Sequence, residues 1–125
     1  MKILLSIKPE YAEKILDGRK HFEFRKKIFK RSEVRTIVIY ATKPLGKVVG
    51  EFEIDEILED KPDKIWRLTK NKSGITKSFF NTYFEKQQTA FAIKVGTIQR
   101  YEKPLDLQDV IPGRPAPQSF CYLSK

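Results

Sequence analysis

The stretch LSIKPEYAEKILDGRKHFEFR, residues 5–25, decides how this chain begins to fold. Residues 2–8, which overlap its start, alternate between apolar and polar side chains, the period-two pattern of a half-buried β-strand. Successive side chains of a strand point to opposite faces, so Ser6 and Lys8 share one face. The pattern therefore predicts a first strand with a polar surface at its end.

A short helix and a second strand are predicted within the same stretch. Pro9 suits the first turn of a helix, and the apolar residues between positions 9 and 17 recur at helical spacing. Gly18 can adopt the positive φ that ends a helix. Residues 21–25 alternate again, and their polar face holds an imidazole, a carboxylate and a guanidinium group.

The turn at Gly18 is expected to gather three charged side chains near the helix end. Glu23 and Arg25 share a strand face with their Cα atoms about 6 to 7 Å apart. An ion pair between them would fix the guanidinium for bidentate recognition of a phosphate or a carboxylate. Lys20 would act as a mobile point charge or, if desolvated, as a base. In the alternative interpretation, the Glu23–Arg25 pair only stabilises the fold.

The rest of the chain is predicted to add strands interrupted by two helices. The strands are expected at residues 36–42, 47–57, 89–95, 97–104 and 119–123, and the helices at 61–69 and 76–86. Gly50 indicates a bulge in the second of these strands. With 125 residues and 40% hydrophobic content, the chain suits one α+β domain, residues 1–125, around a curled sheet.

The two later helices are expected to direct their apolar and aromatic side chains into the core. Thr76 can cap the second of them. The inward-facing residues are predicted by helical spacing to be Ile65, Trp66 and Leu68 in the first helix, and Phe79, Phe80, Tyr83 and Phe84 in the second. Residues 105–117 form a proline-rich connection.

The net charge of +9 is unevenly distributed along the chain. Residues 19–35 hold eight basic and two acidic side chains, whereas residues 51–60 hold six acidic side chains and no basic one. Such focusing of charge favours a polyanionic partner. An ordinary solvated face of a basic protein is the alternative.

Several classes of protein are disfavoured by what the sequence lacks. It has no apolar stretch of the roughly 18 to 20 residues that cross a bilayer, and its first residues do not resemble a secretory signal. One cysteine, Cys121, and one histidine, His21, are too few for a Cys/His zinc site. We therefore expect a cytoplasmic protein without a membrane partner, a metal or another cofactor.

The residues Gly18, Lys20, Glu23 and Arg25 match the pattern Gly-x-Lys-x-x-Glu-x-Arg, and the chain here resembles the ASCH family. The segment 117–123 is also similar to the end of small ASCH proteins. The resemblance implies a PUA-like curled mixed sheet or β-barrel of about five to seven strands, with two to three short helices. It also implies a cleft beside the first helix that binds RNA, modified nucleosides or related ligands.

An enzymatic interpretation would use Lys20 and Glu23 as catalytic residues. Some ASCH proteins are amidohydrolases on acylated cytidines, but their motif has threonine where this chain has Glu23. A carboxylate does not simply replace a hydroxyl nucleophile, and the loop 70–74 offers no acid for that chemistry. A ribonuclease remains an alternative, with Lys20, Arg25 and either Glu23 or His21 arranged around a phosphate.

We favour a noncatalytic domain that binds RNA or a nucleotide, with single-stranded DNA as another partner to consider. Lys8, Lys20 and Arg25 would meet phosphates. A protein-interaction module that uses the acidic strand is a further alternative, and the sequence leaves the oligomeric state open. The candidate ligand-binding residues are Ser6, Lys8, Lys20, Glu23, Arg25, Lys26, Tyr40, Gln118 and Ser119.

Overall fold

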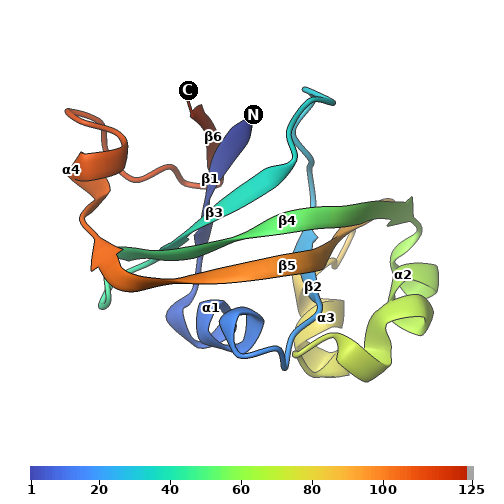
Figure 1. The fold of residues 1–125 in the computed structure, drawn as a ribbon. Coiled ribbons are helices and arrows are strands. Elements are labelled where there is room, and N and C mark those ends of the chain that lie inside the picture. Colours follow the sequence, from blue (N-terminus) through green and yellow to red (C-terminus); the bar gives the residue numbers. More distant parts are fainter. Residues whose placement is uncertain (124–125) are drawn as a thin grey trace.

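A computed structural model describes residues 1–123, whose six strands form one curled sheet (Figure 1). Four α-helices and one turn of 3₁₀-helix accompany it in the described chain. In chain order the elements are β1 (Lys2–Ile7), α1 (Pro9–Leu16), β2 (Phe22–Arg25), β3 (Thr36–Ala41), β4 (Lys47–Asp60), α2 (Pro62–Thr69), η1 (Lys70–Lys72), α3 (Lys77–Tyr83), β5 (Ala90–Leu105), α4 (Leu107–Val110) and β6 (Phe120–Leu123).

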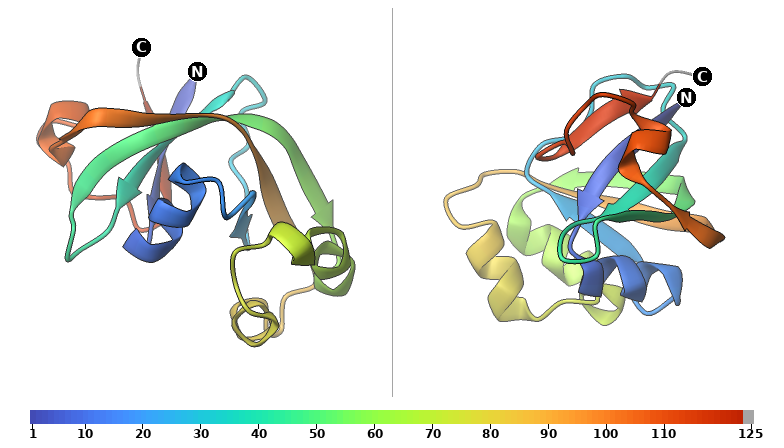
Figure 2. Two further views of the ribbon diagram at one scale, coloured as in Figure 1. Left: turned by 60° about the horizontal axis from the view of Figure 1, so that its bottom comes forward. Right: turned by 90° about the vertical axis from the view of Figure 1, so that its left-hand side faces the viewer.

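The sheet has the strand order β2-β5-β4-β3-β1-β6. β1 pairs with β3 in parallel, and the other neighbouring pairs of described strands are antiparallel. β4 and β5 bend as long arcs over α1, with α2 and α3 beneath one end (Figure 2). This architecture confirms the expected PUA-like α+β fold with a curled mixed sheet, although it carries four short helices rather than two or three.

Gly50 lies where β4 closely approaches β5 and α1. The pairing of β4 with β5 shifts register between Val48 and Gly50, which confirms the predicted bulge. A Cβ atom at Gly50 would lie 2.7 Å from the carbonyl oxygen of Gln99 and 2.8 Å from Cδ2 of Leu16. Only glycine lets β4 approach both β5 and α1 so closely at this position.

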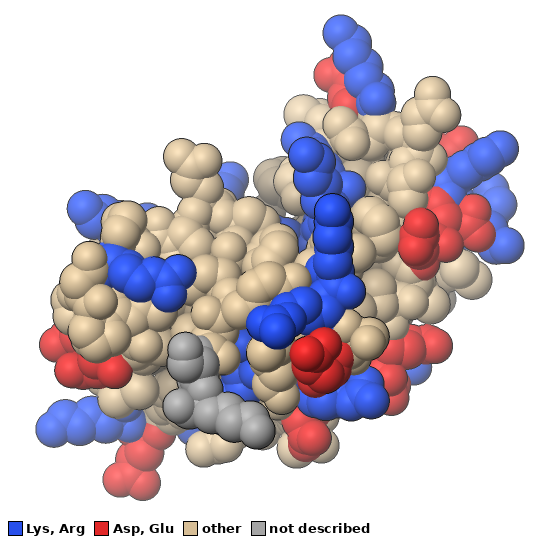
Figure 3. All heavy atoms as spheres, turned by 90° about the horizontal axis from the view of Figure 1, so that it is seen from above, with Lys and Arg blue, Asp and Glu red and all other residues tan. Residues whose placement is uncertain are grey.

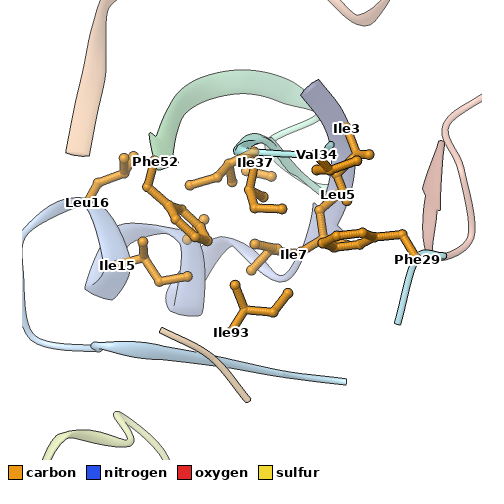
Figure 4. Close-up of a cluster of buried hydrophobic side chains, with 13 residues drawn as sticks. Ile3, Leu5, Ile7, Ile15, Leu16, Phe29, Val34, Ile37, Phe52 and Ile93 are labelled. Atoms are coloured by element: carbon orange, nitrogen blue, oxygen red, sulfur yellow. The ribbon is translucent and has the colours of Figure 1, made fainter. Parts of the chain in front are cut away.

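The main hydrophobic core fills the inside of the curl (Figure 4). β1 contributes Ile3, Leu5 and Ile7, and α1 contributes Ile15 and Leu16. All five are at most 8% exposed. The alternation of β1 and the helical spacing of α1 thus direct their apolar side chains to the same core, which fixes the end of β1 next to the start of α1.

Two further clusters complete the packing. One joins α2 and α3 to the sheet and contains Phe22, Phe24, Ile65, Phe80 and Phe84. The other lies against α4 and the connection that follows it, and contains Leu4, Val38, Tyr40, Val48 and Ile111. β1 and β3 are therefore covered on both faces.

Several elements differ from the sequence-based expectation. The two strands expected at 89–95 and 97–104 form one continuous strand, β5, and β4 runs to Asp60 instead of ending near residue 57. Helix α3 stops at Tyr83 instead of continuing to residue 86, where Lys86 has a φ of 64°. Leu68 is 56% exposed instead of facing inward.

The proline-rich connection also contains a short helix that was not expected. Asp106 and Asp109 form a reciprocal capping box, which explains how α4 starts. Thr76 caps α3 as predicted by accepting a hydrogen bond from the backbone N–H of Phe79. Within residues 1–123 no helix is both long enough and apolar enough to cross a membrane.

Candidate functional site

A cleft of about 330 Å³ opens where the end of β1, α1, β2 and α3 meet. It combines charged, hydroxyl and amide groups with aromatic rings. The residues that line it are Ser6, Ile7, Lys8, Tyr11, Lys20, Glu23, Phe24, Arg25, Ile75, Phe79, Tyr83 and Gln118.

Two local features of the sequence position the charged residues of the cleft. Pro9 starts α1 directly after β1, and the carbonyl oxygen of Lys8 accepts hydrogen bonds from the N–H groups of Tyr11 and Ala12. Gly18 has a φ of 86°, so the chain reverses after α1 and enters β2 at once, as predicted. Lys8, Lys20 and Arg25 consequently lie around one cleft.

Arg25 is held by three groups from three segments of the chain. Its Nη1 atom lies 3.2 Å from Oε2 of Glu23, which confirms the predicted ion pair, and 3.5 Å from the carbonyl oxygen of Ser6. Its Nη2 atom donates to Oγ of Ser119 at 2.5 Å. Because β2 and β6 are the two edge strands, Arg25 connects one edge of the sheet to the segment that precedes the other.

Lys20 is desolvated in the folded protein. Its side chain is 2% exposed, and Nζ donates a hydrogen bond of 2.7 Å to the carbonyl oxygen of Ser73. The ammonium group lies 4.7 Å from the ring centroid of Phe24 and 5.5 Å from that of Tyr11. Burial lowers the pKa of Lys20 to about 8, against the opposing effect of the Glu23 carboxylate. Of the two expected roles, the structure supports the desolvated amine.

Replacing Lys20 with methionine tests this burial. The pKa of Lys20 is about 8 in the folded protein and near its ordinary value of 10.5 in the unfolded chain. The unfolded chain therefore binds more protons between these pH values, so wild-type stability rises with pH across this interval. We expect the free energy of unfolding of wild type, relative to Lys20→Met, to increase by about 2 kcal/mol from pH 7 to pH 10.

Urea denaturation of both proteins at the two pH values measures this change. Tyrosine ionisation alters both proteins alike and cancels in the comparison. A difference in stability that stays constant between pH 7 and pH 10 would show that Lys20 is solvated.

The sequence did not predict the aromatic wall of the cleft, which consists of Tyr11, Phe79 and Tyr83. Phe79 and Tyr83 lie one helical turn apart on α3 with their rings nearly parallel, 6.4 Å between centroids and 11° between planes. Tyr11 from α1 meets Phe79 edge-on at 5.5 Å. The expectation that Phe79 is a core residue was wrong, because Phe80 and Phe84 enter the core while Phe79 lines the cleft. Tyr83 lines the cleft and also packs partly against the core.

Cations lie over these rings. Nζ of Lys8 is 5.6 Å from the ring centroid of Phe79, and Nζ of Lys26 is 4.9 Å from that of Tyr83. Burial raises the pKa of Tyr83 and of Tyr11, so both phenols stay neutral at physiological pH. The cleft therefore offers neutral aromatic surface next to positive charge.

The structure brings most of the predicted binding residues together. Six of them line the cleft, and Lys26 and Ser119 contact side chains that do. Ser6 already uses its hydroxyl to donate to the carbonyl oxygen of Pro117 at 2.6 Å. Tyr40 is not brought to the cleft, because it is 5% exposed and its ring packs against the cluster that contains Ile111.

His21, an alternative base in the sequence analysis, also lies apart from the cleft lining. Its Nε2 atom donates to the carbonyl oxygen of Gly18 at 3.0 Å. Among the described residues, no three His, Cys, Asp or Glu side chains are placed to hold a metal ion.

The fold and the site together define a PUA-like domain with a basic, aromatic-lined cleft. The model of the ASCH domain matches residues 5–99. The chain therefore belongs to the ASCH domain family, and the resemblance found in its sequence is confirmed.

Curated relatives of different kinds match nearly the whole chain. The large ribosomal subunit protein uL22 of Ureaplasma parvum is 28% identical over 97% of this chain, which spans 39% of that protein. The ATP synthase subunit alpha of the same organism is 30% identical, and the match spans 15% of its length. The ASCH domain-containing ribonuclease of Zymomonas mobilis is 27% identical over 98% of this chain and 84% of the relative.

Solved structures agree with this assignment. The crystal structure of ASCH from Zymomonas mobilis superposes with a TM-score of 0.91 at 27% identity, covering 99% of this chain and 88% of that one. A tyrosine-to-phenylalanine variant of that protein gives the same TM-score at 26% identity, covering 91% of its chain.

Proposed function

We propose that the cleft binds a nucleotide of single-stranded RNA, with the base on its aromatic wall and the phosphate on Arg25. The observation that carries this proposal is the placement of four aromatic residues and several cations around one space of about 330 Å³. Single-stranded RNA is recognised by this combination of stacking surfaces and positive charge in many unrelated folds.

The aromatic wall supplies the stacking surface. The nearly parallel rings of Phe79 and Tyr83 extend along α3, and Tyr11 closes the angle between α1 and α3. Stacking of a base on such rings contributes about 1 to 3 kcal/mol and tolerates any base, since every base has a π-face. This wall therefore favours binding without strong selection of sequence.

The polar side of the cleft supplies the phosphate and base-edge contacts. Glu23 and Ser119 fix the guanidinium of Arg25. The Arg25 side chain therefore loses less conformational entropy when it forms a bidentate contact to a phosphate. Within residues 1–123, the hydrogen bonds to the Glu23 carboxylate involve Oε2. Its Oε1 atom can accept from an exocyclic amino group of a base.

Phe79→Ala tests the proposal directly. Removing the ring is expected to weaken binding of an RNA octanucleotide by about tenfold or more, as estimated from the loss of one stacking platform. Fluorescence anisotropy of a labelled strand measures the affinity. Phe79→Tyr keeps the ring face and should bind as wild type does. Equal affinities of all three proteins, or tighter binding of a DNA strand of the same sequence, would contradict the proposal.

A ribonuclease is the second candidate, and the Zymomonas relative favours it. In such a reaction the 2′-oxygen would bond to the adjacent phosphorus, the bond to the 5′-oxygen would break, and a proton would move from the first oxygen to the second. An amine with a pKa of about 8 exists in both protonation states near neutral pH, as general acid–base catalysis requires. Lys20 would be that group, with Arg25 stabilising the charge on the phosphate.

One incubation separates the two functions. The labelled octanucleotide is kept with the protein and then analysed on a denaturing gel. Intact RNA together with measurable binding supports a noncatalytic domain. Product that disappears in Lys20→Met, while that variant remains folded, supports the ribonuclease.

A further inference from the structure

Residues 26–35, here called the basic loop, connect β2 to β3. Five of its ten residues are basic and one is acidic. The basic side chains are all exposed: Lys26, Lys27, Lys30, Arg31 and Arg35. In the part of the chain that the structure describes, the ion pairs of this loop involve only Arg31 and Glu33, 3.7 Å apart. Most of its positive charge is therefore uncompensated.

The backbone of the basic loop is anchored to the body of the protein. Phe29 is 8% exposed and meets the ring of Phe120 edge-on at 6.0 Å. The hydroxyl oxygen of Tyr122 accepts hydrogen bonds from the N–H groups of Lys30 and Arg31, at 3.1 and 3.4 Å. Apolar side chains thus hold the loop from the inside while its cations point outward, which makes it a fixed charged surface.

This surface begins beside the cleft. The loop begins directly after Arg25, and its first residue, Lys26, lies over the ring of Tyr83 in the aromatic wall. In Figure 1 the loop rises from β2 to the end of the molecule where β1 begins and β6 lies. Seen from that end, Lys and Arg side chains gather in a band across the middle of the surface (Figure 3). Positive charge therefore extends beyond the space that one nucleotide occupies.

We propose that the basic loop binds the sugar–phosphate backbone of the RNA strand whose nucleotide occupies the cleft, so that the ligand is an oligonucleotide and not a free nucleotide. This inference rests on the proposed function of the cleft. A free nucleotide would use the aromatic wall and Arg25 alone. Only a longer strand presents successive phosphates to the loop, and each phosphate neutralised on a single strand releases counterions.

The test measures how the affinity depends on the length of the strand and on the charge of the basic loop. Affinities are measured for a mononucleotide and for oligonucleotides of increasing length up to eight, over a series of salt concentrations. The double variant Lys27→Gln/Lys30→Gln removes two loop cations whose side chains form no ion pair within residues 1–123. Lys103→Gln/Arg114→Gln removes the same charge from exposed positions around α4 and serves as the matched control.

We expect the affinity to rise with strand length. The loop variant should bind the octanucleotide roughly fivefold more weakly than wild type at low salt. For the loop variant, the negative slope of log affinity against log salt concentration should become shallower by about 1.4, which is 0.7 for each lost phosphate contact. The mononucleotide should bind the loop variant and wild type equally, and the control should match wild type. Equal affinities for all lengths, or an octanucleotide that is insensitive to the loop variant, would overturn this inference and leave the cleft proposal standing. Absence of any binding would overturn both.

Discussion

Arg25→Ala is expected to weaken binding of single-stranded RNA at least about thirtyfold, an effect of roughly 2 kcal/mol. The guanidinium of Arg25 is held in position by Glu23 and Ser119. A pre-positioned guanidinium can form two parallel hydrogen bonds to a phosphate, and charge-assisted bonds of this kind are stronger than neutral ones. Anisotropy measurements with the octanucleotide give the loss directly.

The same substitution should lower the free energy of unfolding by about 3 kcal/mol. Glu23 is only 7% exposed, and its carboxylate would lose the partner that balances its charge. Arg25 also connects β2 to the segment before β6 through Ser119. Urea denaturation at neutral pH measures this effect independently of RNA binding.

A second substitution separates the two roles of Arg25. In Glu23→Gln/Arg25→Ala the unpaired buried charge is absent, so much of the lost stability should return while RNA binding stays weak. Arg25→Lys keeps a positive charge but cannot form the two parallel bonds, and it should bind with intermediate affinity. Recovery of RNA binding in the double variant would show that Arg25 serves the fold alone.

The ion pair could be predicted from the sequence because its determinants are local. Two residues separated by one position on a strand share a face, and Gly18 fixes where that strand begins. The first strand, the first helix and the order of charged groups around them follow from the same short-range patterns. These elements needed no knowledge of which distant segments pack against them.

The rest of the site depends on contacts between distant segments. Phe79 and Phe80 are equally apolar, and only the packing of α3 beside α1 decides which of them faces the cleft. Tyr40 lies on a strand that is buried on both faces, so its alternation gave no indication of direction. The burial of Lys20 arises from a loop more than fifty positions away, through Ser73.

Gly74→Ala is expected to lower the free energy of unfolding by about 3 kcal/mol, because two costs add at this position. Gly74 has a φ of 72°, which costs an L-residue about 1 kcal/mol or more. An added Cβ would also lie 2.5 Å from both Cβ and Cγ of Lys20, and overpacking of this kind costs about 1 to 3 kcal/mol. Urea denaturation measures the sum.

Gly113→Ala is the matched control for the backbone cost. Gly113 has a φ of 74°, and a Cβ there would meet no heavy atom within 4 Å. It should therefore lose only the conformational part, about 1 kcal/mol. Equal losses in the two variants would show that the loop at Gly74 does not pack tightly on Lys20.

The clash in Gly74→Ala should also change the pKa of Lys20. The carbonyl oxygen of Gly74 accepts a hydrogen bond of 3.2 Å from Nζ of Lys14, and that of Ser73 accepts one from Lys20, so two lysines hold this loop down. If an added methyl group lifts the loop, water reaches the Lys20 amine and its pKa rises from about 8 towards 10.5. The increase in the free energy of unfolding between pH 7 and pH 10 should then be smaller in Gly74→Ala than in wild type. In Gly113→Ala it should be as large as in wild type. Because glycine at position 74 lets the loop pack on Lys20 and exclude water, the pKa of Lys20 depends on a residue outside the motif that contains it.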